Sequence, residues 1–145
     1  VSRFEGFLEK ATELSVYKIT PVLFDRSERK HIKYERFEKI IHAALKQSLR
    51  AYAPILEPLT PLKEIEVNRP TFIAHCEDSP KESLKSAVNG QANCSILIGP
   101  EGDFSKAEIA WANEQNITAV HLGSNRLRTE TAALAALHTA LLMNQ

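Results

Sequence analysis

Two stretches of this chain share one design and constrain its fold more than any other part of the sequence. Residues 96–104 read Ile-Leu-Ile-Gly-Pro-Glu-Gly-Asp-Phe, and residues 122–133 read Leu-Gly-Ser-Asn-Arg-Leu-Arg-Thr-Glu-Thr-Ala-Ala. In each stretch, apolar strand residues run into a turn and then into the predicted start of a helix. In an α/β sheet such turns lie at the carboxyl ends of strands, where open sheets bind ligands. We therefore expect both turns to lie at a ligand-binding edge of the sheet.

The first turn has a composition that favours a sharp bend. Gly99 and Gly102 flank Pro100 and Glu101, so the backbone can turn and a flat ligand can approach it without meeting a Cβ atom. Taken alone, a Gly-Pro-x-Gly turn fits an ordinary connection between a strand and a helix equally well. The occurrence of two such turns is more specific than either one.

The helices that follow the two turns carry start signals. Ser105, followed three residues later by Glu108, fits a capping box, in which each side chain accepts a hydrogen bond from the backbone N–H of the other residue. Thr129 or Thr131 is predicted to cap the last helix. Both turns are thus predicted to lead into the N-termini of helices.

The rest of the chain alternates between strands and helices. Apolar residues at helical spacing or in short β-branched runs predict helices at 4–14, 34–50, 83–88, 106–114 and 131–143, and strands at 16–24, 55–56, 71–76, 94–98 and 118–122. Pro21 indicates an edge or a bulge in the strand at 16–24. The alternation predicts an α/β fold with a mainly parallel sheet and helices on both faces, formed by residues 1–145 as a single domain.

Composition is typical of a soluble globular protein. The chain has 145 residues, of which 43% are hydrophobic and 25% charged, which suits one domain with a substantial core. No apolar run approaches the roughly 18 residues of a membrane span, and no signal peptide is visible at the start, so we expect a cytoplasmic protein with no membrane partner. Because the chain begins without Met, we also expect it to be a fragment of something longer.

Charge and cysteine usage exclude some functions. The formal net charge is zero, which argues against holding nucleic acid by bulk electrostatics, so any RNA contact must be local. Basic residues gather at 26–33 and 46–50, where a solvated loop and a solvated helix face are the simpler alternatives. Cys76 and Cys94 lack CxxC or His-rich spacing, so we expect no metal site, and both are expected to be buried, reduced thiols.

The two turn motifs resemble the signature of a known enzyme family. Gly-Pro-Glu-Gly-x-Phe-Ser at 99–105, followed by Leu-Gly at 122–123 and Leu-Arg-Thr-Glu-Thr-Ala-Ala at 127–133, is similar to the RsmE-type 16S ribosomal RNA uridine-N3 methyltransferases of the SPOUT superfamily. Residues 7–14 are similar to the family's first helix. Asp25-Arg26-Ser27 resembles its acidic-Arg-Ser loop, and Gln47-Ser48 followed by Arg50 resembles a Gln-Ser-x-Arg motif.

The chain departs from the family pattern at a few positions. Asp103 stands where a second Gly is usual, and Asn125 stands where Arg is frequent, with Arg126 one residue later. We expect these two changes to alter contacts at the rims of the turns without abolishing cofactor binding. Ser15 replaces a usual Gly, and Gly6 replaces a residue that is often large and apolar.

The resemblance implies a fold and a domain context. Family members thread the C-terminal part of the chain through a deep trefoil knot. They also carry a small PUA-like β-barrel domain before this region, which helps to grip RNA, and we expect it to be absent here. Full activity of the present chain alone is therefore in doubt.

The resemblance also implies S-adenosyl-L-methionine as cofactor, folded into a cleft made by the knot loops. Adenine is held there mostly by backbone groups, which explains why no Rossmann Gly-x-Gly-x-x-Gly fingerprint is present. By the resemblance, the cofactor pocket is assigned to Ile73, Ala74, His75, Ile98, Gly99, Pro100, Glu101, Gly102, Leu122, Gly123, Arg126 and Leu127.

The implied reaction is transfer of a methyl group to N3 of a uridine in 16S ribosomal RNA of the small subunit. Arg128 and Glu130 are the catalytic candidates. Arg128 would hold the uracil carbonyl oxygens or a phosphate, and Glu130 would accept the N3 proton. Alternatively, Glu130 only caps the helix or pairs with Arg128. The candidates for RNA contact are Lys10, Arg26, Arg29, Gln47 and Arg50.

The resemblance further implies a homodimer, with the last helix in the interface. Residues 132–143 are apolar almost all round, so this helix must be buried, either in its own core or against a partner. Two other functions stay open: a knotted methyltransferase for another RNA such as transfer RNA, and a non-catalytic RNA-binding module. A P-loop or hydrolase is disfavoured, because no Lys-Ser/Thr follows the first turn and no Gly-x-Ser-x-Gly elbow is present.

Overall fold

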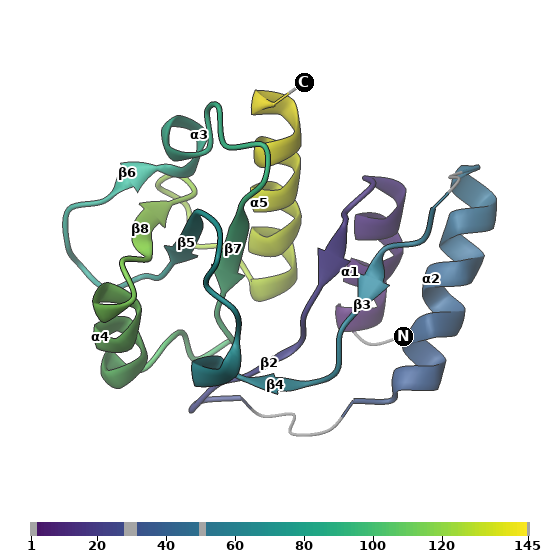
Figure 1. The fold of residues 1–145 in the computed structure, drawn as a ribbon, viewed down its shortest axis with the longest axis horizontal. Helices are drawn as coiled ribbons and strands as arrows, with labels where there is room; N and C mark the ends of the chain where they lie inside the picture. Colours follow the sequence, from purple (N-terminus) through teal and green to yellow (C-terminus); the bar gives the residue numbers. More distant parts are fainter. Residues whose placement is uncertain (1–2, 28–31, 50–51, 145) are drawn as a thin grey trace.

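The computed structural model describes residues 3–27, 32–49 and 52–144, which form two adjoining groups of elements (Figure 1). The first group contains two helices and four strands of two residues each. The second group contains a four-stranded sheet with helices on both of its faces. The last helix, α5, lies between the sheet and the helix pair of the first group, so it touches both parts (Figure 1).

Helices α1 (Arg3–Glu13) and α2 (Tyr34–Ser48) pack against each other in the first group. Their buried apolar residues recur at helical spacing, as Leu8 and Ala11 in α1 and Phe37 and Ile41 in α2. Both helices were predicted from this spacing, and both are confirmed, although α2 ends two residues before the predicted bound.

The four short strands of this group pair two by two. Strand β1 (Lys18–Ile19) pairs in parallel with β3 (Ile55–Leu56), and β2 (Val22–Leu23) pairs in parallel with β4 (Thr60–Pro61). Ile19 of β1 and Leu56 of β3 belong to the buried cluster of α1 and α2, whereas Val22 of β2 packs against the cluster that includes Ile73 and Ile109. The single strand predicted at 16–24 is therefore two strands. The break falls at Pro21, whose carbonyl accepts a hydrogen bond from Thr60 N at 2.9 Å, while its own nitrogen has no hydrogen to donate.

The second group is organised by a sheet in the order β6-β8-β5-β7, in which every pair is parallel. Its strands are β5 (Thr71–Ala74), β6 (Glu82–Ser83), β7 (Ser95–Ile98) and β8 (Thr118–His121). Adjacent residues of β5 face opposite ways: Ile73 joins the buried cluster that includes Ile109 and Ala112, and Phe72 joins the one that includes Leu84 and Ala136. The prediction of a mainly parallel sheet covered on both faces is confirmed.

Three helices and one short turn complete this group. Helix α4 (Lys106–Glu114) covers one face, and α3 (Leu84–Ala87) and α5 (Thr129–Met143) cover the other. A 3₁₀ turn, η1 (Leu62–Glu64), leads from β4 towards β5. The predicted capping box is confirmed: Ser105 Oγ accepts from Glu108 N at 3.2 Å, and Glu108 Oε1 accepts from Ser105 N at 2.8 Å.

Two predictions about single residues are wrong. Neither Thr129 nor Thr131 caps α5, because the N-cap residue is Arg128 and its side chain makes no capping bond; Thr129 Oγ1 instead donates to Gly99 O at 3.0 Å. Cys76 is exposed, since β5 ends at Ala74 and Cys76 lies beyond the sheet. Cys94 is half-buried, and burial raises the pKa of its thiol.

Helix α5 is apolar but only thinly covered. Of its residues, which the structure describes in full, only Ala136 is buried, and Leu142 is 52% exposed. Within the described ranges, no helix combines the length and apolar character needed to cross a membrane.

Candidate functional site

Register brings the predicted pocket residues together at the carboxyl edge of the sheet. Ala74 at the end of β5 lies opposite Ile98 at the end of β7, and Ile73 pairs with Ala119 of β8. Because these strands are all parallel, the segments that follow them share one edge. The first turn (Gly99–Asp103) and the second turn (Leu122–Leu127) therefore face the same region of the molecule, as the sequence predicts.

The first turn is held by a hydrogen bond within it, by the ring of Phe104 and by Thr129. Asp103 N donates to Pro100 O at 2.9 Å, which closes the turn. Phe104 is 2% exposed and its ring lies against Gly99, where an added Cβ would stand 2.9 Å from Phe104 Cε2. Thr129 at the start of α5 donates to Gly99 O at 3.0 Å, so the helix after the second turn fixes the backbone of the first turn.

Asp103 ties the first turn to the segment that follows β5. It adopts a left-handed conformation with φ 65°, which a Gly in the usual family pattern adopts at lower cost. Its Oδ2 accepts a hydrogen bond from Cys76 N at 3.2 Å. The substitution therefore adds a contact at the rim of the turn in exchange for backbone strain.

A third set of contacts comes from the segment after β2. Arg26 Nη1 donates to Gly102 O at 2.8 Å. Ser105 Oγ donates to Asp25 Oδ2 at 2.6 Å, and Asp25 N donates to Glu108 Oε2 at 2.9 Å. The first turn is thus connected to β5, to α5 and to the segment after β2.

The second turn is open by comparison. Gly123 has φ 115°, and a Cβ placed there would meet no atom within 4 Å. Its N–H donates to His121 Nδ1 at 3.2 Å, a bond across only two residues. Arg126 is exposed and Leu127 is half-buried. The backbone of this turn is accessible to a ligand at the same edge.

His75 and Ile73 differ in what they can offer to this edge. Ile73 is 1% exposed and its side chain belongs to the core, so only its backbone is placed to line a pocket. His75 is 6% exposed, and its Nδ1 is a buried polar atom without a hydrogen-bond partner. Burial lowers the pKa of His75, and Lys81 lowers it further, whereas Asp103 and Glu77 act in the opposite direction.

The catalytic candidates lie at the start of α5. Arg128 is exposed and is the N-cap residue of α5, directly before the helix begins. Glu130 lies 3.8 Å from Arg3 Nε, measured from its Oε1, and 23% of its side chain is exposed. The observed ion pair of Glu130 thus reaches to α1 and not to Arg128, its predicted alternative partner.

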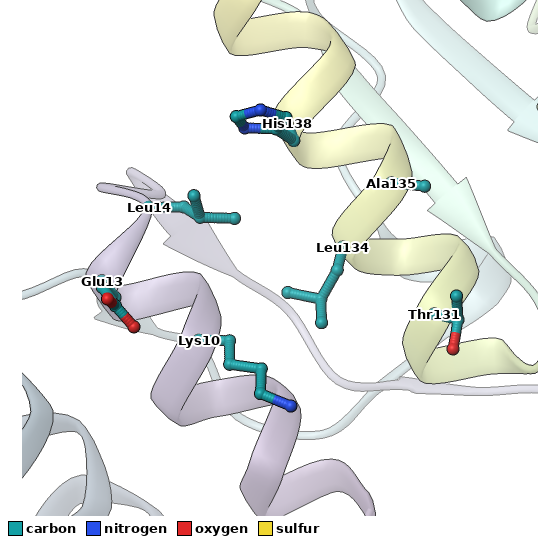
Figure 2. Close-up of a pocket in the computed structure, with 7 residues that line it drawn as sticks. All are labelled: Lys10, Glu13, Leu14, Thr131, Leu134, Ala135 and His138. Atoms are coloured by element: carbon teal, nitrogen blue, oxygen red, sulfur yellow. The ribbon is translucent and has the colours of Figure 1, made fainter.

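The candidates for RNA contact are dispersed. Lys10 lines an apolar groove of about 540 Å³ between α1 and α5 (Figure 2). Arg26 lies against the first turn, and Gln47 is exposed near the C-terminal end of α2. The C-terminal end of α2 and the segment after β2 lie far apart (Figure 1). Arg29 and Arg50 lie outside the described residues.

Sequence reasoning missed the roles of two residues that shape the site. Thr129 was expected at a helix cap, and Asp25 was noticed only as part of a loop motif. The contact at the rim of the turn that was expected to change at Asp103 is present. The acidic-Arg-Ser motif was the one available signal for Asp25. Among the described residues, no group of three or more His, Cys, Asp or Glu side chains is placed to hold a metal ion.

Comparison with known proteins places this geometry in a family. A family model described as an RNA methyltransferase domain matches residues 1–141. Ribosomal RNA small subunit methyltransferase E of Rickettsia conorii is 29% identical over 135 residues, covering 90% of this chain and 55% of the relative. Its counterpart in Aquifex aeolicus is 33% identical over 151 residues, covering 97% and 62%.

A solved structure agrees with the sequence matches. The crystal structure of ribosomal RNA small subunit methyltransferase E from Neisseria gonorrhoeae bound to S-adenosyl methionine has a TM-score of 0.84 and 29% identity, covering 97% of this chain and 61% of that one. The chain thus spans between 55% and 62% of the length of these three proteins. The family model and these relatives confirm the resemblance, and the chain belongs to the RNA methyltransferase domain family.

Proposed function

We propose that this chain is the catalytic domain of an S-adenosylmethionine-dependent enzyme that methylates N3 of a uridine in 16S ribosomal RNA, in the cytoplasm. The observation that carries the proposal is the meeting of the two glycine-containing turns at one edge of a parallel sheet. The relatives named above act on small-subunit ribosomal RNA by name, and one of them binds this cofactor. We also propose that the C-terminal part of the chain forms a deep trefoil knot, as the resemblance to the SPOUT superfamily implies.

The residues at this edge fit the cofactor. A Cβ at Gly123 would meet no atom within 4 Å, so a flat ligand can approach its backbone, which suits recognition of an adenine ring by N–H and C=O groups. Gly102 is also exposed, although its carbonyl already accepts a hydrogen bond from Arg26. The unpartnered Nδ1 of buried His75 is a polar atom that a bound polar ligand can satisfy. The cofactor pocket is therefore proposed at residues 73–75, 98–102, 122–123 and 126–127.

Bound S-adenosylmethionine supplies an electrophilic methyl group. The protein must present an unpaired uracil and remove the N3 proton, because N3 lies on the Watson–Crick edge and is protonated at neutral pH. Arg128 is exposed at the mouth of α5, where its planar guanidinium can hold the uracil carbonyl oxygens. Glu130 lies two residues further along, in the first turn of α5, and is proposed to accept the proton.

The ion pair with Arg3 gives a way to test Glu130. If Glu130 serves only to join α5 to α1, Glu130→Gln and Arg3→Gln remove the same contact and have the same effect. A proton acceptor makes the two variants differ, since Gln at position 130 cannot take a proton and the Arg3→Gln variant keeps the carboxylate. We expect Glu130→Gln to lower the methylation rate by about 100-fold or more, and Arg3→Gln by less than about threefold.

RNA contact is proposed at Lys10, Arg26, Arg29, Gln47 and Arg50. Because Lys10, Arg26 and Gln47 are dispersed in one chain, a continuous RNA surface requires either residues of a second copy or further parts of the protein. A second copy is proposed to cover the groove between α1 and α5. Leu14, Leu134 and Ala135 line that groove (Figure 2). Leu142, which is 52% exposed, adds apolar surface further along α5.

The first experiment is titration of the purified chain with S-adenosylmethionine by calorimetry, with its mass measured in solution. Saturable binding by a dimer supports the proposal, and a well-folded dimer that does not bind favours a non-catalytic RNA-binding module. Methylation is then compared between small-subunit particles and transfer RNA, with radiolabelled methyl groups located on the product. Methyl transfer to transfer RNA alone, or to an atom other than uridine N3, would refute the proposed substrate.

A further inference from the structure

The segment at residues 24–27 makes polar contacts with the C-terminal part of the first turn and with the residue that caps α4, although these partners lie 76 and 80 residues further along the chain. Arg26 donates to the carbonyl of Gly102 within the turn. Asp25 accepts from the hydroxyl of Ser105, which follows the turn. Ser27 Oγ accepts from Phe24 N at 3.0 Å, so the segment is itself closed by a hydrogen bond.

Glu108 is the point where this segment and the first turn meet. The residue is 4% exposed, and its two carboxylate oxygens accept from two different backbone groups: Oε1 from Ser105 N at 2.8 Å and Oε2 from Asp25 N at 2.9 Å. The N-terminus of α4 favours the negative charge of this buried carboxylate. A capping box accounts for the bond to Ser105 only. The bond to Asp25 has no part in starting the helix, so it serves to fix the segment after β2.

An aromatic contact also joins residues 24–27 to the region of the first turn. The rings of Phe24 and Phe104 meet edge to face with centroids 5.1 Å apart. Phe104 in turn lies against Gly99, at a distance that leaves no room for a Cβ atom there. Because Phe104 contacts both Phe24 and Gly99, a shift of Phe24 would also displace the backbone of the first turn.

We propose that residues 24–27 hold the first turn in the shape that its cofactor requires, with Glu108 and Arg26 as positioning residues. The inference rests on the proposed function, since the ligand in question is S-adenosylmethionine. A ligand recognised by backbone groups binds tightly only if those groups are already in place, because ordering them on binding lowers the affinity. Arg26 then acts on the cofactor through the carbonyl of Gly102, which is a different role from RNA contact.

Glu108→Gln tests the proposal with one change of atom type. Gln keeps the shape of Glu but has one acceptor oxygen and one NH₂ group, which would face the N–H of Ser105 or of Asp25 donor to donor. We expect the calorimetric Kd for S-adenosylmethionine to rise about tenfold, which is the size of one lost hydrogen bond to a charged group. Hydrogen exchange at residues 99–105 should accelerate in the ligand-free protein. Glu114→Gln, an exposed change at the other end of α4, is the matched control and should alter neither quantity.

Arg26 is tested by a pair of variants. Arg26→Ala should raise the Kd for S-adenosylmethionine about threefold, and Arg26→Lys, which keeps a donor for Gly102 O, should restore most of the affinity. If Arg26→Ala weakens RNA binding and leaves the cofactor Kd unchanged, the positioning role of Arg26 is wrong. The proposal as a whole is wrong if Glu108→Gln accelerates hydrogen exchange at residues 99–105 but leaves the Kd for S-adenosylmethionine unchanged.

Failure of the proposed function gives a different result. The unmodified chain would then not bind S-adenosylmethionine at all, whatever the variants do. Exchange at residues 99–105 in the ligand-free protein still decides whether residues 24–27 hold the turn: equal protection in the unmodified protein and in Glu108→Gln would show that they do not.

Discussion

The two turns at the carboxyl edge of the sheet look alike in sequence but are held very differently. The first turn (Gly99–Asp103) is bonded to the end of β5, to the start of α5 and to the segment after β2, and Phe104 packs beneath it. The second turn (Leu122–Leu127) has a bond from Gly123 to His121, and four of its six residues are exposed. One turn is therefore fixed by tertiary contacts, while the other is shaped mainly by its own sequence.

This difference indicates a division of labour between the turns. A turn with several tertiary contacts is already ordered before a ligand arrives, so little conformational entropy is lost when the ligand binds. A turn with few buried contacts opens locally at a lower free energy and can adjust to the ligand. For the cofactor that we propose at this edge, we infer that the first turn sets its position and that the second turn adjusts to it.

The largest contrast in stability should come from two apolar residues: Phe104, directly after the first turn, and Leu127, at the end of the second turn. Phe104→Ala removes a ring that is 2% exposed and packs on both Phe24 and Gly99, so we expect a loss of about 3–5 kcal/mol in the free energy of unfolding. Leu127→Ala, at a half-buried position, should cost about 1 kcal/mol. Urea denaturation followed by circular dichroism measures both. Equal losses would show that the second turn is as firmly packed as the first.

A smaller contrast is expected from added methyl groups. Gly99→Ala places a Cβ 2.9 Å from the Phe104 ring, and we expect it to lower the free energy of unfolding by about 1–3 kcal/mol. Gly6→Ala is the matched control, because no atom lies within 4 Å of the new methyl group and Ala favours the interior of α1. It should raise the free energy of unfolding by about 0.5–1 kcal/mol. Two changes of the same sign, measured by thermal and urea unfolding, would contradict the packing described here.

Local signals in the sequence predicted the elements around the first turn well. The capping box of Ser105 and Glu108 was visible because its two members are three residues apart, and α4 has the predicted bounds. The alternation of strands and helices gave the parallel sheet. Cys76 was wrongly expected to be buried, since the apolar run at 71–76 does not show that the strand stops at Ala74.

Local sequence signals could not predict contacts between distant parts of the chain. Asp25 and Glu108 are 83 residues apart, and no periodicity or spacing relates them. Thr129 looked like a helix cap, but the first turn offers its hydroxyl the carbonyl of Gly99 instead. The pocket residues were predicted from a resemblance to a known family. The hydrogen bonds that hold the first turn in place become visible only in the folded structure, where the sheet brings distant segments together.

A pH-dependent contrast centres on His75, next to the first turn. Because burial and Lys81 lower the pKa of His75, the unfolded chain takes up this proton at a higher pH than the folded chain does. Stability should therefore fall as the pH is lowered from about 6.5 towards the folded pKa. Asp103 opposes the shift, so Asp103→Gly should lower the pKa of His75 further. NMR titration of the imidazole measures both values, and a folded pKa at or above 6.5 would contradict the prediction.

The smallest effect on stability is expected in the second turn, where it separates folding from binding. Arg126 is exposed, and its replacement by Ala should change the free energy of unfolding by less than about 0.5 kcal/mol. The cofactor Kd, measured by calorimetry, should nevertheless rise about threefold, because the lost side chain belongs to the proposed pocket. Glu108→Gln, in contrast, should act on the cofactor by loosening the first turn before binding. If Arg126→Ala also accelerated hydrogen exchange at residues 99–105, the two turns would be one cooperative unit, and the division of labour between them would be wrong.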